Sequence, residues 1–426
     1  MSLLKLPIVV ILSLIISGCS LIGGQKNQAV TIKYWGLWDS AIVMNQIRQD
    51  YKKIKPNVDI IYEKKSPQQY RESLQAQINS TTGPDIFQFH NTWTQMLESE
   101  LAPIPQSIIS QSQFKDEYYP TIFNDLRNSN KEFVGAPLGI DGLGLYYNED
   151  IFQAAGISQP PSSWQELANT VVKLTVRDTA GNIRTAGIAL GSASNVDHFS
   201  DILALMILQN GGDLKNPVDA RSADALEYYA NFARGDIRVW DETMSPSTVA
   251  FTGGSLAMYL APSWRAAEIK TANPLLKFKI APVPQLEGGS VSWASYWAIG
   301  VSKKTKYQKE ALEFLKYLQE DDTLIKLYSE SAKTPGRIIG MPYPKKSLAQ
   351  KLASDPLVGA YVSEAPFMRS FPMASRTFDN GLNDQIIKAY EDAVNEVLKG
   401  TPASNALETT AKNIRETLAK YPKKPQ

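Results

Sequence analysis

VTIKYWGLWDS (30–40) combines a strand pattern with an abrupt stop. From residue 30 to residue 35, apolar and polar side chains alternate, which is typical of a half-buried β-strand. Residues 41–55 then carry apolar side chains at helical spacing, and Pro56 ends the predicted helix. The segment therefore predicts a strand that leads through a short loop into a helix.

The same unit is repeated further along the chain. A second strand is predicted over 58–62, a second helix follows Pro67, and GPDIFQFH (83–90) contains a third strand over 85–89. Strands that alternate with helices over short connections predict a parallel, right-handed α/β sheet. In such a sheet, ligands bind outside the carboxyl ends of the strands, which we call the strand-end rule.

Polar and aromatic side chains follow the predicted ends of the first and third strands. Trp38 and Asp39 follow the first strand, and His90 and Asn91 come at the end of the third. We therefore expect these four side chains to face a ligand. Each has an alternative: Asp39 could cap the following helix, and Trp38 could pack at the rim. His90 and Asn91 could simply form a polar loop end.

The first residues indicate export. Lys5 precedes an apolar run over 6–16, which is too short to cross a membrane, since that needs about 20 residues. The run suits a signal peptide over 1–18, and Ile16-Ser17-Gly18-Cys19 resembles the bacterial lipobox. We expect Cys19 to be lipidated, with residues 19–28 as a flexible tether. The lipid would then hold the protein on the outer, extracellular or periplasmic side of the cell membrane.

Composition narrows the class of protein. Cys19 is the single cysteine, so the exported chain can form no internal disulfide and must rely on a large core. The chain has 44 Lys and Arg and 43 Asp and Glu residues, and removal of residues 1–18 takes away one lysine. The mature chain is thus formally neutral, which argues against a nucleic-acid partner. We expect most of its 8 Trp and 19 Tyr residues to pack in the core or on the surface, and some of them to line a ligand groove.

Later segments add helix and strand signals. Ser163 and Glu166 have capping-box spacing, and we expect Trp164 between them to pack in the core. Residues 291–301 are predicted as a strand and residues 310–318 as a helix. Two amphipathic helices end the chain and are separated by Gly400 and Pro402.

The order of these motifs resembles that of a known family. The motifs are KYWGLWDS (33–40), GPDIFQFH (83–90), APLGIDGLGLYYNED (136–150), PPSSWQEL (160–167), FTGGSLAMYLAPSW (251–264), WASYWAIGVSKKTKYQKEALEFLKYL (293–318), TPGR (334–337) and KGTPASNALETTAKNIRETL (399–418). Together they resemble the extracellular solute-binding proteins of ABC importers, and most closely the sugar-binding group that includes maltose-binding protein. The resemblance covers essentially the whole mature chain.

The resemblance implies a type II periplasmic-binding-protein-like α/β fold with two lobes and a ligand cleft between them. Lobe one would comprise 29–143 plus 300–335, and lobe two 149–295 plus 338–426. Strand-like hinges would lie near 144–148, 296–300 and 334–338. Such proteins close around a solute by hinge motion and present it to permease subunits. The implied protein is a monomer with a sugar-like ligand, no cofactor, no metal and no catalytic residue.

The resemblance also implies further ligand residues. A sugar site needs carboxylates, amides and arginines for the hydroxyls and flat rings for the C–H faces. Asp141 matches an acidic ligand of the maltose-binding group, although it could be a turn residue before Gly142. Trp264 matches a sugar-stacking ring. The remaining candidates lie near the hinges or before the first terminal helix: Trp293, Trp297, Arg337 and Arg376. Trp293 and Trp297 would share one face of a strand, with one on the ligand and the other in the hinge core.

Three other functions stay open at this stage. A glycosidase needs only two carboxylates, although no nucleophile elbow, phosphate-binding loop or zinc motif is present in the sequence. A phosphorylated polyol such as glycerol phosphate would be favoured if Arg265, Arg337 and Arg376 converge. The protein could also serve a sensor in place of a transporter.

Overall fold

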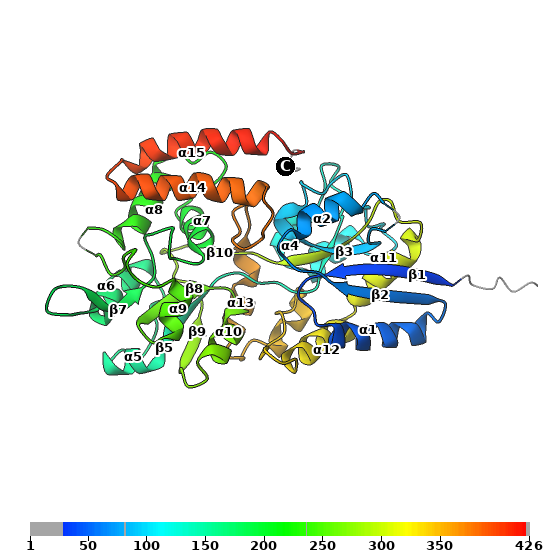
Figure 1. Ribbon diagram of the computed structural model, residues 1–426, viewed down its shortest axis with the longest axis horizontal. Helices are drawn as coiled ribbons and strands as arrows, with labels where there is room; N and C mark the ends of the chain where they lie inside the picture. The colour runs from blue at the N-terminus through cyan, green and yellow to red at the C-terminus, as the bar shows by residue number, and fades with distance from the viewer. Residues whose placement is uncertain (1–28, 81, 236, 423–426) are drawn as a thin grey trace, which may run out of the picture.

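A computed structural model describes residues 29–80, 82–235 and 237–422. Figure 1 shows two halves side by side, each built around its own β-sheet. We call the half that contains the first strand the first lobe and the other the second lobe. The predicted signal peptide, Cys19 and the tether to residue 28 lie outside the described residues. None of the helices among the described residues combines the length and apolar character needed to cross a membrane.

The first lobe is built on a five-stranded sheet. Its order is β2-β1-β3-β11-β4, with β1 (Val30–Gly36), β2 (Val58–Lys64), β3 (Ile86–His90), β11 (Trp297–Val301) and β4 (Ala136–Pro137). Strand β1 runs parallel to β2 and β3, while β11 is antiparallel to β3 and β4. The predicted parallel strand–helix–strand unit is therefore confirmed, and a late strand of the chain completes the sheet.

Amphipathic helices cover this sheet. They are α1 (Ala41–Ile54), α2 (Tyr70–Gln77), α3 (Gln111–Glu117), α4 (Pro120–Asp125), α11 (Gln308–Leu318) and α12 (Asp321–Ala332), with short helical turns η1 (Asn91–Trp93) and η2 (Lys346–Lys351). Helix α11 turns its apolar residues inward because they recur every three to four positions. Its Phe314 ring lies 4.8 Å from that of Tyr51 on α1 and 6.4 Å from that of Tyr34 on β1.

The second lobe contains the other five-stranded sheet. Its order is β6-β7-β8-β5-β9, with β6 (Val176–Arg177), β7 (Ile183–Ile188), β8 (Leu256–Ala261), β5 (Gly144–Asn148) and β9 (Phe278–Ala281). All six residues of β8 are buried, as expected for a central strand with covered faces. Around the sheet lie α5 (Glu149–Ala154), α6 (Trp164–Leu174), α7 (Phe199–Gln209), α8 (Ala220–Asn231), α9 (Ser247–Thr252) and α10 (Arg265–Ala272).

The predicted start of α6 is only partly correct. Ser163 accepts a hydrogen bond from the Glu166 backbone N–H, as a capping residue does. The Glu166 carboxylate, however, binds the backbone N–H and the hydroxyl of Ser162, so the reciprocal half of the capping box is shifted by one residue. Trp164 is buried as predicted.

The end of the chain covers the second lobe and its boundary with the first. α13 (Gly359–Glu364) and η3 (Ala365–Phe367) lead into β12 (Met368–Arg369), which pairs with β10 (Ser292–Trp293). α14 (Leu382–Leu398) and α15 (Ala403–Leu418) then pack against each other and along α8 (Figure 1). Gly400, with a φ of +102°, ends α14 as predicted.

The described chain passes between the lobes three times. The first passage joins β4 to β5 and the second joins β10 to β11, so the strand predicted over 291–301 is interrupted. At their crossing only glycine fits at position 142, because a Cβ atom there would lie 1.9 Å from the Trp293 carbonyl oxygen.

The domain boundaries stay a prediction. Lys345 binds Asp321 on α12, which favours a third passage later than the predicted 334–338.

Candidate ligand cleft

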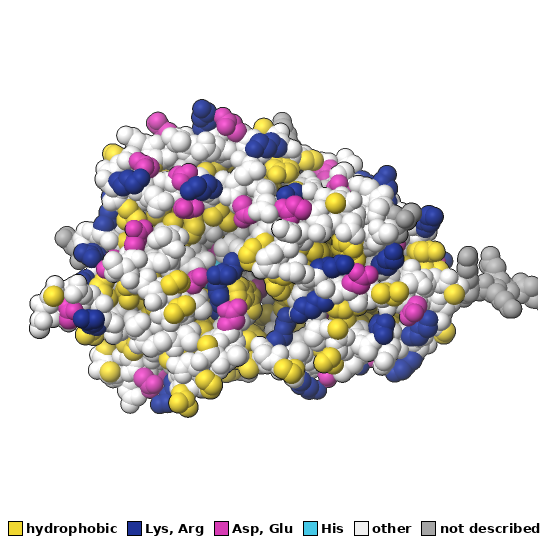
Figure 2. All heavy atoms as spheres, viewed as in Figure 1, with side chains coloured by type: hydrophobic (Ala, Val, Ile, Leu, Met, Phe, Trp, Pro, Cys, Tyr) yellow, Lys and Arg dark blue, Asp and Glu magenta, His cyan; other side chains and the backbone are white. Residues whose placement is uncertain are grey.

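A cavity of about 500 Å³ lies where the two lobes meet. Gln68 and Gln69, just before α2, line it from the first lobe. The second lobe contributes the start of α7, the segment before α14 and α14 itself, through Asp197, Phe199, Ser200, Ser375, Arg376, Phe378, Asn380, Asp384 and Ile387. Figure 2 shows the surface hollowed at the boundary of the two halves, with acidic and basic side chains nearby.

The lining combines three kinds of side chain. Phe199, Phe378 and Ile387 are apolar, while the amides and hydroxyls come from glutamines, an asparagine and serines. The charged groups are Asp197, Asp384 and Arg376. A second hollow, between α14 and α15, is lined mainly by charged and amide side chains and by no aromatic ring. The interlobe cavity is therefore the better candidate for a ligand with both polar and apolar surfaces.

Asp197 forms ion pairs with two arginines beside the cavity, Arg376 and Arg265. Its Oδ1 lies 2.8 Å from Arg376 Nη2 and 3.8 Å from Arg265 Nη2. Its Oδ2 accepts the Thr248 backbone N–H at 2.9 Å. Burial opposes ionisation, but the hydrogen bonds from Thr248 and the charge of Arg265 lower the pKa of Asp197 to about 2. The carboxylate is thus charged at neutral pH and faces both guanidinium groups, and Glu268 supplies the second negative charge beside Arg265.

Trp264 lies on the second lobe with 39% of its surface exposed. The guanidinium carbon of Arg265 lies 4.4 Å from the centre of the Trp264 ring, a cation–π contact. Arg265 Nε donates to His198 Nε2 at 3.1 Å, so His198 carries its proton on Nδ1, which faces Ser375 Oγ at 2.8 Å. Burial lowers the pKa of His198, in keeping with a neutral ring. Arg265 covers one side of the Trp264 ring.

Trp297 is the centre of an aromatic cluster on the first lobe. Its ring meets those of Trp38, Trp93 and His90 edge to face, with centroids 5.2–5.5 Å apart. Trp38 and Trp297 are half-buried. Arg337 Nη2 donates to the Trp38 carbonyl oxygen at 2.6 Å, so this arginine binds the first lobe and does not join Arg265 and Arg376 at Asp197.

Asp39 is held by Gln88, whose Nε2 donates to Asp39 Oδ2 at 2.9 Å. Ser40, and not Asp39, caps α1 by accepting the Val43 backbone N–H at 3.2 Å. Asp39 therefore stays half-buried at the end of β1, where the strand-end rule places a ligand residue, and its alternative capping role is wrong.

Two residues predicted to face the ligand are buried beside the second passage between the lobes. His90 is 1% exposed, with Nδ1 2.8 Å from Thr92 Oγ1 and Nε2 3.1 Å from Ser295 Oγ. Burial lowers the pKa of His90 to about 4, so the ring is neutral. Asn91 donates to Asp125 at 3.0 Å and accepts the Tyr296 backbone N–H at 3.1 Å. Both side chains therefore satisfy polar groups of the second passage.

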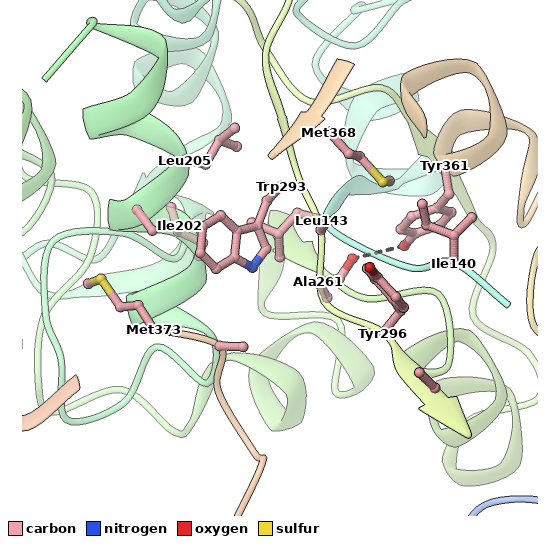
Figure 3. Packing of buried hydrophobic residues seen from close by; sticks show 14 of the residues in the cluster. Ile140, Leu143, Ile202, Leu205, Ala261, Trp293, Tyr296, Tyr361, Met368 and Met373 are labelled. Atoms are coloured by element: carbon pink, nitrogen blue, oxygen red, sulfur yellow. Dashed lines mark hydrogen bonds between the residues drawn. The ribbon is translucent and has the colours of Figure 1, made fainter. Parts of the chain in front are cut away.

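Trp293 is a core residue. It is fully buried, and its Nε1 donates to Asp201 Oδ1 at 2.7 Å. Figure 3 shows its ring between Ile202 and Leu143, with Met373 nearby. Of the two tryptophans placed on one strand face, Trp293 fills the hinge core and only Trp297 retains exposed surface. The strand is interrupted between residues 293 and 297, and the Trp293 ring has no exposed surface in this conformation.

Asp141 ties the first passage to the turn that carries Trp264. Its Oδ1 accepts the backbone N–H groups of Gly142 at 2.8 Å and Ser263 at 3.2 Å, and the Ser263 hydroxyl donates to Oδ2 at 2.8 Å. The side chain is 3% exposed. Burial outweighs these hydrogen bonds and raises the pKa of Asp141 to about 7. The predicted ligand residue is thus a buried support for the Trp264 turn.

Hydrogen bonds join the lobes beside the cavity. Asn383 Nδ2 donates to Thr92 Oγ1 at 2.7 Å, and Asn380 Nδ2 donates to Glu72 Oε1 at 2.8 Å. Asn383 is fully buried, whereas Asn380 is exposed. These contacts bring the start of α14 against η1 and α2, which closes one side of the cavity.

Strained backbone is concentrated in the same place. Gln69, Arg376, Phe378 and Asn380 have positive φ angles of 60°, 58°, 54° and 43°, and all four line the cavity. Each such residue costs about 1–3 kcal/mol, and such strain often marks ligand sites. Arg376 is the one member of the predicted site among the residues that line the cavity.

Sequence reasoning missed most of the lining. The segment 197–200 follows β7 on the chain, so the strand-end rule applied to the second sheet would have pointed to it. Gln68, Gln69 and Asn380 belong to no motif. Among the described residues, no three His, Cys, Asp or Glu side chains gather as a metal site would require.

Comparisons with known proteins agree with this architecture. The sequence profile of the bacterial extracellular solute-binding protein family matches residues 46–339. The sn-glycerol-3-phosphate-binding periplasmic protein UgpB of Pectobacterium atrosepticum is 22% identical over 352 residues, which cover 74% of this chain and 75% of that protein. The multiple sugar-binding protein of Streptococcus mutans is 22% identical over 378 residues, or 82% and 85% of the two chains.

Solved structures show the same fold. The sugar-binding protein MalE of Xanthomonas citri superposes with a TM-score of 0.73 at 20% identity and covers 92% of this chain and 98% of its own. A solute-binding protein of Thermotoga lettingae bound to α-D-tagatose gives 0.69 at 20% identity, with 91% and 99% covered. The predicted two-lobed, type II α/β fold is therefore confirmed.

The buried Asp141 carboxyl should give stability a pH dependence. Its folded pKa of about 7 lies above the ordinary value of 3.8. Between these values the unfolded state loses the proton first, so the free energy of unfolding should fall as pH rises, by up to about 1.4 kcal/mol per pH unit. Asp141→Asn cannot ionise and should remove this contribution. Urea denaturation of both proteins from pH 4 to pH 8 measures the free energy of unfolding at each pH. If this free energy varied with pH in the same way in both proteins, the prediction would be wrong.

Proposed function

Because the chain belongs to the family of bacterial extracellular solute-binding proteins, we propose that its interlobe cavity captures a neutral sugar or oligosaccharide for delivery to an ABC transporter permease. The observation that carries this proposal is the mixed lining of the cavity. Phe199 and Phe378 offer flat apolar rings, and the surrounding amides and hydroxyls offer hydrogen bonds. A sugar presents the complementary surfaces, with hydroxyls at its edges and C–H groups on its faces.

The charges of the lining favour a neutral solute. Two carboxylates, Asp197 and Asp384, and one guanidinium, Arg376, line the cavity. Burial and the neighbouring Asp379 raise the pKa of Asp384 to about 6, so it is mostly ionised at neutral pH. A phosphate group with a charge of about −1.5 to −2 would enter a site that is already slightly negative.

A phosphorylated polyol is the second candidate. UgpB, whose name specifies sn-glycerol 3-phosphate, aligns with three quarters of this chain, and two of the three candidate arginines do converge. Arg265 and Arg376, however, converge on the carboxylate of Asp197, and Arg337 binds the other lobe. Compensated arginines are weaker phosphate ligands than free ones.

Hinge closure would couple capture to delivery. The lobes are joined by three passages and by the contacts of α14 with the first lobe. A solute that contacts both walls stabilises the state in which the walls are close, and the permease can distinguish that state. Such a role needs no bond-making group, and we propose a monomer without catalytic activity. Delivery to a sensor would use the same closure.

The amino terminus would set the location. We propose that residues 1–18 are a signal peptide and that Cys19 receives a lipid, which holds the protein on the outer face of the cell membrane. The first described strand, β1, has its start at the end of the first lobe away from the second (Figure 1). An anchor attached there would leave the cleft free.

A thermal-shift screen tests the ligand. Solved structures similar to this chain hold tagatose, maltotetraose or mannobiose. We expect D-tagatose, mannobiose or maltotetraose to raise the melting temperature by several degrees at about 100 times its Kd, since a ligand that binds only the folded state stabilises it. Glycerol 3-phosphate should give no shift. Stabilisation by glycerol 3-phosphate alone would select the second candidate. Chromatography of each sugar after incubation is the control for catalysis, and turnover would contradict a binding protein.

Phe378→Ala should weaken sugar binding. Loss of a ring that covers the sugar removes about 1.5–3 kcal/mol, which raises Kd about 10- to 100-fold. Phe367→Ala is the matched control, because Phe367 is 49% exposed and does not line the cavity. Isothermal titration calorimetry compares the two. Equal affinities would show that the ring at 378 is not part of the site.

Cys19→Ala should release the protein from the membrane. The wild-type chain should partition with the membrane fraction and into a detergent phase, because its lipid chains anchor it. The variant should appear in the soluble fraction, while Ser20→Ala should behave as wild type. Immunoblots of the fractions decide the outcome, and a membrane-bound Cys19→Ala protein would refute the anchor.

A further inference from the structure

The hydroxyl of Ser200 has no hydrogen-bond partner among the described residues, although the side chain is fully buried. A helical serine commonly satisfies itself on the carbonyl four residues earlier. Here that carbonyl, of Val196, accepts the Phe199 backbone N–H instead. An unsatisfied buried hydroxyl destabilises a folded protein, so its presence in the structure needs an explanation.

Backbone N–H groups in the first turn of α7 also lack hydrogen-bond acceptors among the described residues. Its capping position is occupied by His198, whose ring binds Arg265 and Ser375 and makes no capping bond. The described residues provide no acceptor for the backbone N–H groups of Ser200 and Asp201. The Asp201 carboxylate, which could have turned back to them, binds Trp293. Unlike α7, the helices α5, α6 and α8 are all capped by side chains.

Ser200, which carries both the free hydroxyl and one of the free backbone N–H groups, lines the cavity. Asp197, Phe199 and Ser200 all line it, so the amino-terminal end of α7 forms part of its wall. That end carries the positive end of the helix dipole, which attracts electron-rich oxygen atoms. The carboxylates of Asp197 and Asp384 line the same space and disfavour an anion. A neutral oxygen, such as a sugar hydroxyl, satisfies both conditions because it accepts from the helix and can donate to a carboxylate.

The segment before α14 covers this turn in the present conformation. Ser375 donates its backbone N–H to Asp201 Oδ2 at 3.1 Å, which holds the segment against α7. The two residues that flank Thr377 are strained, since Arg376 and Phe378 have positive φ. A strained cover can shift at modest cost when new contacts replace the old ones.

We propose that Ser200 is a specificity-determining residue whose hydroxyl, with the open first turn of α7, binds one hydroxyl oxygen of the captured sugar. The assignment rests on the proposed function and adds to it a polar contact that no motif of the sequence indicates. Ser200 stays unsatisfied in the empty protein and gains its partner only when the sugar is bound. Its loss therefore affects binding and not folding.

Ser200→Ala tests this assignment against Ser222→Ala. Ser222 is also fully buried in the first turn of a helix, but its hydroxyl donates to Asp219 at 2.7 Å. Without ligand, Ser200→Ala should melt at or above the wild-type temperature, whereas Ser222→Ala should lose about 2–4 °C. For whichever of D-tagatose, mannobiose and maltotetraose binds the wild type, Ser200→Ala should raise Kd about 3- to 10-fold. Ser222→Ala should leave Kd unchanged.

The outcomes separate the two proposals. Wild-type affinity in a Ser200→Ala protein overturns the role of Ser200 while sugar binding stands. A melting temperature as low as that of Ser222→Ala, or failure to fold, shows that the hydroxyl is structural and also overturns it. If no sugar of the panel binds the wild type, the proposed function falls and the assignment falls with it.

Discussion

The hydrogen bond between the Trp293 indole and the Asp201 carboxylate joins the hinge to the candidate site. The donor lies in the second passage between the lobes, and the acceptor lies in the first turn of α7. The same carboxylate holds the Ser375 backbone, whose neighbours line the cavity. A buried carboxylate left without donors would cost more than the bond contributes, so the Trp293 segment and the first turn of α7 stay together even when the Ser375 segment shifts. One buried carboxylate thus links the passage between the lobes to the cavity wall and its cover.

The sequence was sufficient for the architecture because the architecture follows from short-range patterns. The alternation in β1 and the helical spacing in α1 are properties of neighbouring residues, and the parallel pairing of β1 with β2 and β3 follows from their order. Trp264 and Trp297, predicted from their motifs to contact a ligand, both keep exposed surface, although neither lines the interlobe cavity. Such residues stand at positions where the chain must leave a strand, which is visible in the sequence.

The cavity could not be derived in the same way, because its walls come from segments near residues 68, 198 and 380 that meet only in the folded protein. The strand-end rule gives the place of His90 and Asn91 but not their direction, and both turn to the hinge. Asp141 turned to the Trp264 turn for a similar reason: a buried backbone turn needs acceptors. The left-handed backbone at Arg376 and Phe378 has no local signature, since neither residue type favours it.

The ion pairs that Asp197 forms with Arg265 and Arg376 have a consequence for the salt dependence of ligand binding. Salt largely screens interactions between exposed charges that lie more than about 8–10 Å apart, but it screens paired, buried charges much less. Arg265 and Asp197 are both largely shielded from solvent, and the more exposed Arg376 is in direct contact with Asp197. Capture of an uncharged solute by such a site varies little with salinity. If the proposed function holds, such a site would bind its sugar equally well at low and at high salt concentration, whereas a site that relied on long-range ionic attraction would lose affinity as the salt concentration rises.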